Sequence, residues 1–255
     1  MGGKIECYID IPSYYSYIAF VQLQQNKELL KQNGIEVELH PILLGAINAG
    51  SGNRPPWILP AKAKYSKYDT KRAADAVGLR DVSVPGDDLM EVSKTMLPLR
   101  ALTHMKSAFP EEVYMTAFAY LFHAFWTLHK ISNSAPGLSE VLSEIPEHFR
   151  LDCFTFPSTP TTKPNPTSSS KKLFTPEQVC QILEAASSTE MKATLKARVD
   201  EALARGAFGA PWIWATDAQG CSEPFFGSDR WNCVYDFLGV PYQKLQLLPP
   251  QKAQL

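Results

Sequence analysis

The sequence predicts an α/β fold in which a helical segment separates two strand-forming regions. Near the N-terminus, a strand, a helix and a second strand are expected between residues 4 and 43. Near the C-terminus, strand patterns at 212–216 and 222–226 flank a turn-forming tetrapeptide. Helical patterns dominate the chain between these regions. We therefore expect an α/β framework built from both ends of the chain, with an inserted all-helical subdomain.

The N-terminal region has the pattern of a βαβ unit. Apolar and polar side chains alternate over residues 4–11, and Pro12 ends that strand. Residues 13–33 carry apolar side chains at helical spacing, and Gly34 is a typical residue after a helix end. Alternation resumes over residues 35–43. Strand, helix and strand in this order predict a parallel pair joined by a right-handed crossover.

The middle of the chain is predicted to be helical. A Gly/Pro-rich loop and four helices are expected in the order 49–60, 61–77, 89–107, 111–130 and 138–145. The third helix is apolar on most sides, so we expect it to be buried among its neighbours. Residues 156–172 are rich in Pro, Ser and Thr and predict a mobile surface loop, either a tolerated insertion or a regulatory segment.

Two helices, a hairpin and a final helix are predicted to complete the fold. Thr175-Pro176 begins a helix with an N-cap residue and a proline at the first helical position. A break at 187–189 separates it from a second helix, which ends at Gly206. Residues 217–220 form the turn between the two C-terminal strands. Ser228-Asp229 is then expected to cap the last helix.

Composition excludes several classes of function. The 255-residue chain has a formal net charge of −1, which gives no reason to expect nucleic acid or an anionic membrane as a partner. No apolar run reaches the roughly 18 residues that a membrane span needs, and the early strand pattern predicts no signal peptide. The five cysteines form no Cys-x-x-Cys pair, and no Cys/His spacing suits a metal. We therefore expect a metal-free protein of a reducing compartment.

Three short segments carry the candidate chemistry. Ser13 lies where the first strand meets its helix, a position that suits an N-cap residue or an anion held by free N–H groups. Ala210-Pro211 follows a Gly-containing stretch, and a bend there would leave the Ala210 backbone free to pair with an extended peptide. Ser228 and Asp229 could take the carboxylate and ammonium of an amino-acid end, or could simply cap a helix. Together these segments outline a thioredoxin-like site with hydroxyls where a redox protein has cysteines.

Parts of the sequence resemble kappa-class glutathione transferases, a DsbA-like group of the thioredoxin superfamily related to bacterial 2-hydroxychromene-2-carboxylate isomerases. The matching stretches are residues 8–20, 51–65, 206–211 and 226–230. They occur in the family's order near both ends of the chain. The resemblance implies a thioredoxin-like fold with a helical insertion. It places residues 1–64 and 188–255 in the glutathione-binding domain and residues 65–187 in the helical domain.

The resemblance also implies roles for individual residues. Ser13 matches the serine that stabilises the glutathione thiolate, and Tyr15 and Ser16 are further hydroxyls that could support the site. The residues that match contacts to the tripeptide are Asn53 and Lys62, Ala210 beside Pro211, and the γ-glutamyl clamp of Ser228 and Asp229. The chain departs from the family at Tyr14, where proline is common, and at two bulky tryptophans after the proline of the bend.

Three functions fit this site. The first is a glutathione transferase that conjugates glutathione to small hydrophobic electrophiles or reduces peroxides. The second is an isomerase in which the glutathione thiolate adds to a conjugated double bond and is released again. The third is a non-catalytic protein that binds glutathione or docks partners. The resemblance further implies a homodimer and a mitochondrial or peroxisomal location, with the cytosol as the alternative.

Overall fold

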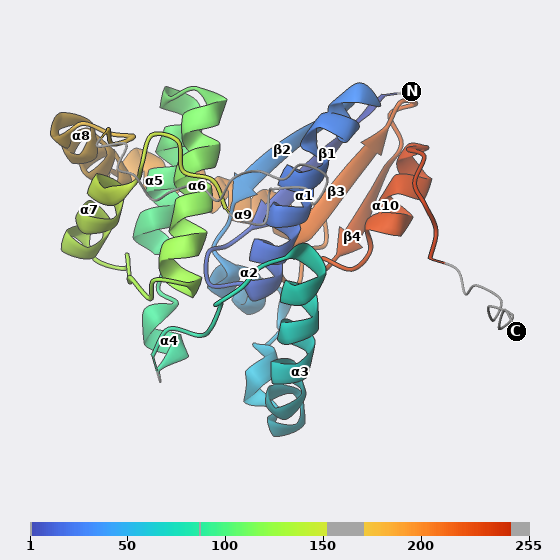
Figure 1. The fold of residues 1–255 in the computed structure, drawn as a ribbon, viewed down its shortest axis with the longest axis horizontal. Coiled ribbons are helices and arrows are strands. Elements are labelled where there is room, and N and C mark those ends of the chain that lie inside the picture. The colour runs from blue at the N-terminus through green and yellow to red at the C-terminus, as the bar shows by residue number, and fades with distance from the viewer. Residues whose placement is uncertain (1, 87, 152–170, 246–255) are drawn as a thin grey trace, which may run out of the picture.

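A four-stranded mixed sheet in the order β2-β1-β3-β4 organises the structure (Figure 1). This computed structural model describes residues 2–86, 88–151 and 171–245. The strands are β1 (Gly3–Ile9), β2 (Ile35–Pro41), β3 (Trp212–Asp217) and β4 (Ser222–Phe226). β1 runs parallel to β2 and antiparallel to β3, so strands from both ends of the chain meet at β1. The predicted α/β fold is therefore confirmed.

Helices pack against both faces of this sheet. In chain order they are α1 (Tyr14–Gln32), α2 (Leu44–Ser51), the 3-10 turn η1 (Pro56–Ile58), α3 (Pro60–Val77), α4 (Leu89–Val92), α5 (Met96–Ala108), α6 (Glu111–Trp126), α7 (Ala135–Glu144), α8 (Pro176–Ser187), α9 (Thr189–Ala204) and α10 (Trp231–Leu238). α1 and α10 share a core with Ile5 and Cys7 of β1. α2 and α9 share a second core with Tyr8. This division follows from strand alternation, because successive side chains point to opposite faces.

The inserted helices α4 to α8 lie beside the sheet, and α6 joins them to α1 (Figure 1). Phe118, Phe122 and Phe125 of α6 are buried, as the apolar pattern predicted. The Phe122 ring stacks on Tyr17 of α1 with ring centroids 4.9 Å apart. The helical insert is thereby packed against the helix that begins after Ser13.

Two predicted helices in the first half of the chain have the wrong bounds, and a third helix was not predicted. Residues 89–107 form two helices rather than one, with the break at 93–95. The helix predicted to reach residue 130 ends at Trp126, and His129 adopts a left-handed φ of 54°. α2 was not predicted, and its last three residues, 49–51, fall in the predicted 49–60 loop. Its start escaped prediction because the preceding Leu43 has no capping group, and a distant carboxylate accepts the hydrogen bond from the first N–H instead.

The second half follows the sequence pattern more closely, with one exception. α8 begins with a capping box between Thr175 and Gln178, and Ser188 caps α9 at the predicted break. The last helix begins later than expected, because Arg230 rather than Ser228-Asp229 occupies its N-cap position. The predicted cap is therefore wrong.

Two further predictions can be placed on the structure only in part. Most of the predicted 156–172 loop lies outside the described residues.

The expected domain boundary after residue 64 falls inside α3, whereas the boundary after residue 187 coincides with the end of α8. Within the described ranges, no helix has the length and apolar character that crossing a membrane requires.

Candidate active site

Ser13 connects the start of α1 to a loop from the other end of the chain. It is the N-cap residue of α1, and its Oγ accepts a hydrogen bond from the Ser16 N–H at 3.2 Å. The same hydroxyl donates to the Ala210 carbonyl at 2.9 Å. Ser13 is 6% exposed, so the residue is almost completely buried. The predicted cap is confirmed, and the bond to Ala210 brings two of the three candidate segments together.

The loop before β3 has the bend that the sequence suggested. The Ala210–Pro211 peptide bond is cis. The Pro211 carbonyl accepts a hydrogen bond from the Gly227 N–H at 3.2 Å, which holds the turn after β4 beside this loop. Gly209 lies against the Phe226 ring, and an added Cβ would be 2.7 Å from a ring carbon. The predicted segments at 206–211 and 226–230 are therefore in direct contact.

Asn53 and Lys62 line one hollow of about 370 Å³ between the end of α2 and the start of α3. The Asn53 side chain donates to the Phe208 carbonyl at 2.6 Å and accepts from the Arg54 N–H at 2.8 Å. Asn53 thus attaches the hollow to the cis-proline loop, and Lys62 places an exposed ammonium at the same hollow. A small anion could be held there by this ammonium.

Ser228 and Asp229 occupy the turn after β4 and differ in exposure. Ser228 is 6% exposed, whereas the Asp229 side chain is 70% exposed. The Asp229 carboxylate pairs with the neighbouring Arg230. Gly227 has a φ of 92°, so a glycine is required for the turn that brings these two residues beside the cis proline. A positively charged ligand group would have to compete with Arg230 for this exposed carboxylate.

The other hydroxyls near Ser13 have partners of their own. The Tyr15 hydroxyl donates to Asp69 of α3, and the Tyr14 hydroxyl donates to the Thr70 carbonyl at 3.0 Å. Burial, with help from the Asp69 hydrogen bond, raises the pKa of Tyr15. Ser16 is fully buried and accepts from the Asp10 N–H at 3.4 Å. The two tyrosines therefore tie α1 to α3, and Ser16 supports the turn from within.

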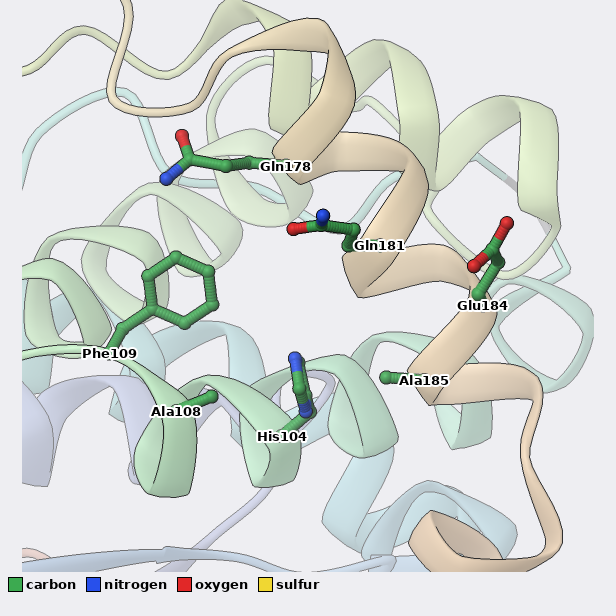
Figure 2. A pocket seen from close by; sticks show the side chains of 7 residues that line it. All are labelled: His104, Ala108, Phe109, Gln178, Gln181, Glu184 and Ala185. Atoms are coloured by element: carbon green, nitrogen blue, oxygen red, sulfur yellow. The ribbon is translucent and has the colours of Figure 1, made fainter.

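A larger hollow of about 610 Å³ lies in the helical insert (Figure 2), and it is lined by none of the candidate site residues. Its lining residues come from α8 and from the C-terminal end of α5 with Phe109, which follows it. His104 and Glu184 are the ionisable side chains among them. No local sequence pattern marks this hollow, because its walls are set by the packing of α5 against α8.

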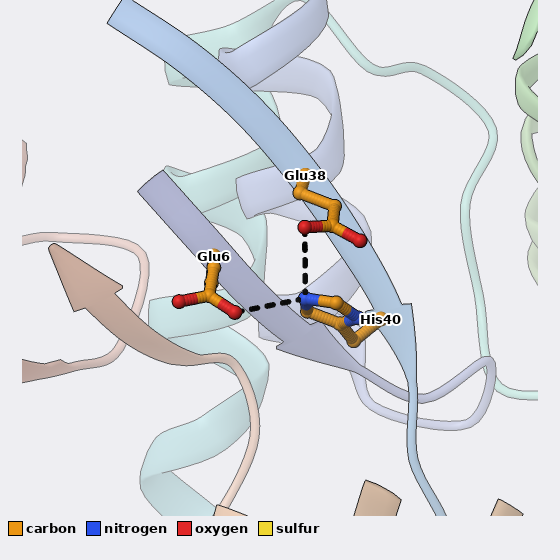
Figure 3. A group of neighbouring side chains, drawn as sticks. All are labelled: Glu6, Glu38 and His40. Carbon is orange, nitrogen blue, oxygen red and sulfur yellow. Dashed lines mark ion pairs between the residues drawn. The ribbon is translucent and has the colours of Figure 1, made fainter. Parts of the chain in front are cut away.

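A charged cluster that the sequence did not predict lies on the α9 face of the sheet. Glu6 and Glu38 pair in register on β1 and β2, and both point toward His40 (Figure 3). Lys106 lies 2.9 Å from His40 Nδ1, so its ammonium donates there and the imidazole Nε2 lies 3.3 Å from Glu6. Burial, with the nearby Lys106 ammonium, holds the pKa of His40 well below its ordinary value. His40 is therefore neutral at physiological pH.

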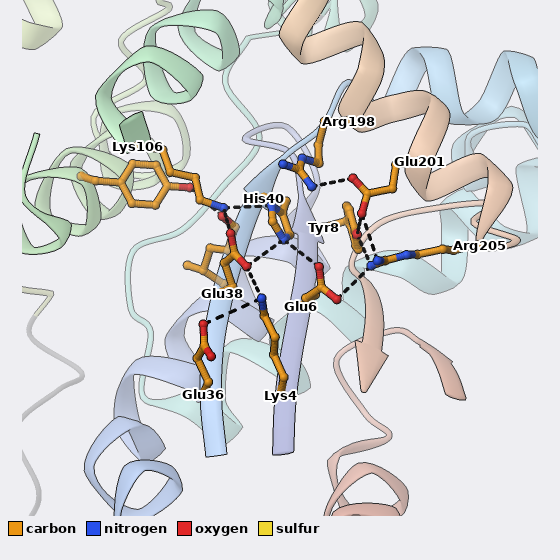
Figure 4. Close-up of polar contacts among 12 residues, drawn as sticks. Lys4, Glu6, Tyr8, Glu36, Glu38, His40, Lys106, Arg198, Glu201 and Arg205 are labelled. Atoms are coloured by element: carbon orange, nitrogen blue, oxygen red, sulfur yellow. Dashed lines mark hydrogen bonds and ion pairs between the residues drawn. The ribbon is translucent and has the colours of Figure 1, made fainter. Parts of the chain in front are cut away.

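Cations already occupy the carboxylates of this cluster (Figure 4). Glu38 contacts both Lys4 and Lys106 at 2.6 Å, and Glu6 contacts Arg205 at 3.0 Å. These ammonium and guanidinium groups compete with any metal ion for the same oxygens, so we interpret the cluster as an ion-pair network. Polar side chains recur at every second position of the two strands, and this pattern could have indicated the cluster. It was not recognised because only the structure shows that α9 covers that face of the sheet.

The geometry thus defines a thioredoxin-like protein in which a serine begins the helix that faces the cis proline. Residues 4–145 match the DsbA-like thioredoxin domain, and the chain belongs to that family.

Full-length relatives place the chain more narrowly. It is 27% identical to glutathione S-transferase kappa 1 of Caenorhabditis elegans, with 99% of this chain and 98% of that protein covered. It is 26% identical to glutathione S-transferase kappa 1 of Homo sapiens, with 92% and 90% covered. A solved structure of 2-hydroxychromene-2-carboxylate isomerase has the same fold, with a TM-score of 0.64, 17% identity, and 92% and 94% of the two chains covered. The chain is therefore a distant relative of kappa-class glutathione transferases.

Proposed function

We propose that this protein binds glutathione and holds its thiol as a thiolate, for conjugation to small hydrophobic electrophiles or for reduction of peroxides. The observation that carries the proposal is the Ser13 hydroxyl at the N-terminus of α1, 2.9 Å from the Ala210 carbonyl. A thiolate at this point would meet a hydroxyl donor and the positive end of a helix. Similarity to kappa-class glutathione transferases over nearly the whole chain supports glutathione as the thiol.

In this proposal glutathione replaces a hydrogen bond that the protein already makes, the bond from the Ser13 hydroxyl to the Ala210 carbonyl. The cysteinyl N–H of an extended tripeptide would donate to the Ala210 carbonyl, as in strand addition. The Ser13 hydroxyl, released from that carbonyl, would then donate to the thiolate. The glycyl carboxylate would approach Lys62 and Asn53 in their common hollow, and the γ-glutamyl ammonium would pair with Asp229.

The energies of these interactions are sufficient for thiolate formation. An ordinary cysteine thiol has a pKa of about 8.5, and lowering it by about two units requires roughly 2.7 kcal/mol. A helix N-terminus contributes about 0.3–1 kcal/mol, and up to about 2 in partly buried sites. A hydrogen bond to a charged group contributes about 1.5–3 kcal/mol. Together the hydroxyl and the helix end supply about 1.8–5 kcal/mol, a range that includes the required value, whereas the helix end alone falls short.

The test is Ser13→Ala, with Ser188→Ala as the matched control. Both substitutions remove an N-cap serine, but Ser188 caps α9 and makes no part of the proposed site. We expect Ser13→Ala to bind glutathione in calorimetry and to raise the bound thiol pKa by about one unit or more, followed by thiolate ultraviolet absorbance. Ser188→Ala should leave the thiol pKa at the wild-type value. An unchanged titration for Ser13→Ala refutes the role of the hydroxyl.

A glutathione-dependent isomerase is the second candidate, and the shared fold with 2-hydroxychromene-2-carboxylate isomerase favours including it. Both reactions need the same thiolate. They differ in stoichiometry, because conjugation consumes glutathione and isomerisation returns it. Measuring glutathione before and after complete turnover, with aryl halides, peroxides and chromene acids in parallel, separates them. Binding without thiolate formation would instead indicate a non-catalytic glutathione-binding or partner-docking protein.

The family similarity also supports proposals about assembly and organisation. We propose a homodimer in a mitochondrial, peroxisomal or cytosolic compartment, which analytical ultracentrifugation and imaging of the tagged protein would test. We also propose that residues 1–64 and 188–255 form the glutathione-binding part and that residues 65–187 form the helical part. The electrophile would then bind where the two parts meet.

A further inference from the structure

Asp10 is a buried carboxylate at the junction of the first strand and three helices. It follows β1 directly and is 1% exposed. One carboxylate oxygen, Oδ2, accepts a hydrogen bond from the Leu44 N–H at 2.7 Å. The other, Oδ1, accepts from the Thr95 hydroxyl at 2.8 Å. Both partners are neutral donors, and each lies at the beginning of a helix, α2 or α5.

The backbone of Asp10 holds the turn that presents Ser13. Its carbonyl accepts from the Ser13 N–H at 3.2 Å, and its N–H donates to Ser16 Oγ at 3.4 Å. Ser16 in turn donates its N–H to Ser13 Oγ. The residue that is tied to α2 and α5 through its side chain is therefore tied to the Ser13 turn through its main chain.

The Asp10 carboxylate lies at the N-termini of α2 and α5, where neither N-cap residue makes a capping hydrogen bond of its own. Leu43, at the N-cap position of α2, has an apolar side chain, and Thr95, at the N-cap position of α5, turns its hydroxyl toward Asp10. A negative charge at a helix N-terminus is stabilised by the helix dipole and by its free N–H groups. Burial raises the pKa of Asp10 to about 7, while the bonds from Leu44 and Thr95 oppose that rise. A buried carboxyl is costly, and this one has a neutral donor on each oxygen, which indicates a role beyond packing.

We propose that Asp10 is the positioning residue for the Ser13 hydroxyl, fixing the 10–16 turn against α2 and α5. The proposal rests on the proposed function, in which that hydroxyl donates to the glutathione thiolate. Asp10 acts through Ser13 and makes no contact with the thiolate in this scheme. Loss of its side chain would let the turn shift, so the hydroxyl would donate less well.

The direction of the pKa change distinguishes this role from a simple charge effect. Removing a nearby negative charge favours a thiolate and lowers the thiol pKa. Misplacing the Ser13 hydroxyl removes a hydrogen bond to the thiolate and raises the thiol pKa. Positioning and charge therefore predict opposite signs for the same substitution.

The experiment is a double-mutant cycle on the full-length protein with bound glutathione, read by thiolate ultraviolet absorbance. Asp10→Ala should raise the bound thiol pKa by about one unit, the equivalent of one lost hydrogen bond. Asp10→Asn keeps the shape and an acceptor for the Leu44 N–H, so it should restore about half of that change. In a Ser13→Ala background, Asp10→Ala should add nothing. A fall in the thiol pKa, or a full additive effect in that background, overturns the proposal.

A milder pair of variants keeps the test valid if Asp10→Ala does not fold. Thr95→Val removes one carboxylate partner and nearly preserves side-chain shape, and it should also raise the thiol pKa. Thr103→Val is its control on the same helix, because the Thr103 hydroxyl donates to the Leu99 carbonyl of α5 itself. Equal titrations for these two variants overturn the proposal. Failure of the proposed function is a separate result, namely that Ser13→Ala alone leaves the thiol pKa unchanged.

Discussion

Replacing Phe122 with alanine tests whether α6 and α1 form one core. Phe122 is fully buried, and its ring lies 4.9 Å from that of Tyr17, 5.2 Å from that of Phe118 and 5.4 Å from that of Phe20. Two of these partners belong to α1 and one to α6. Phe122→Ala therefore opens a cavity at the contact between the helical insert and the helix that begins after Ser13.

The expected cost follows from the burial and the lost ring contacts. Truncation of a buried phenylalanine to alanine costs about 3–5 kcal/mol, because transfer and cavity terms add. In a chain of this size each kcal/mol lowers the melting temperature by about 2–4 °C, so we expect a fall of roughly 6–20 °C. The loss should be near the upper end, since three aromatic neighbours surround the ring and a stacked pair adds about 0.5–1.5 kcal/mol.

The assay is chemical unfolding followed by circular dichroism, with melting temperatures from calorimetry. Leu29→Ala is the control, because Leu29 lies on α1 but is 55% exposed, and it should change the free energy of unfolding by less than about 0.5 kcal/mol. If Phe122→Ala costs less than about 1 kcal/mol, or no more than Leu29→Ala, the reasoning about a shared core is refuted.

Three further predictions concern the site and the charged cluster. Gly209→Ala should weaken glutathione binding about five-fold in calorimetry, because the new Cβ displaces the Phe226 ring, whereas Gly45→Ala should leave it unchanged. Asn53→Ala should also weaken binding about five-fold through loss of its bond to the cis-proline loop, and an unaltered dissociation constant would contradict this. The unfolded chain binds a proton at His40 below about pH 6.5 that the folded chain excludes, so stability should fall as pH decreases from there. Below about pH 6.5 the free energy of unfolding should therefore depend less on pH for His40→Gln than for the wild type, as measured by chemical unfolding at a series of pH values.

The sequence predicted the parts of the site whose signals are local. Its place between a strand and a helix suited Ser13 to an N-cap or to an anion site, and the structure confirms the cap. The break at Ser188 and the burial of α6 were likewise visible in short windows. These features depend on neighbours within about one helical turn, which the sequence displays directly.

The missed features depend on partners far along the chain. α2 begins at Leu44 because a carboxylate from the end of β1 accepts its first N–H, and Leu43 gave no warning of this. Tyr15 stays a predicted supporting residue, and its hydroxyl reaches Asp69, a partner 54 positions away that no local pattern indicated. Glu38 and His40 have polar side chains on a strand, yet only the packing of α5 and α9 shows that they are enclosed.

The bond between Ser13 and Ala210 joins atoms 197 positions apart in the sequence. A nascent polypeptide therefore cannot complete this site until nearly all of it has left the ribosome, however early the βαβ unit folds. A ligand of this site that is present during synthesis would bind only chains that have been completed and folded. Binding would stabilise those chains by mass action and would leave incomplete chains unprotected. If glutathione binds as proposed, its protection of the chain from proteolysis would report that translation and folding have both ended.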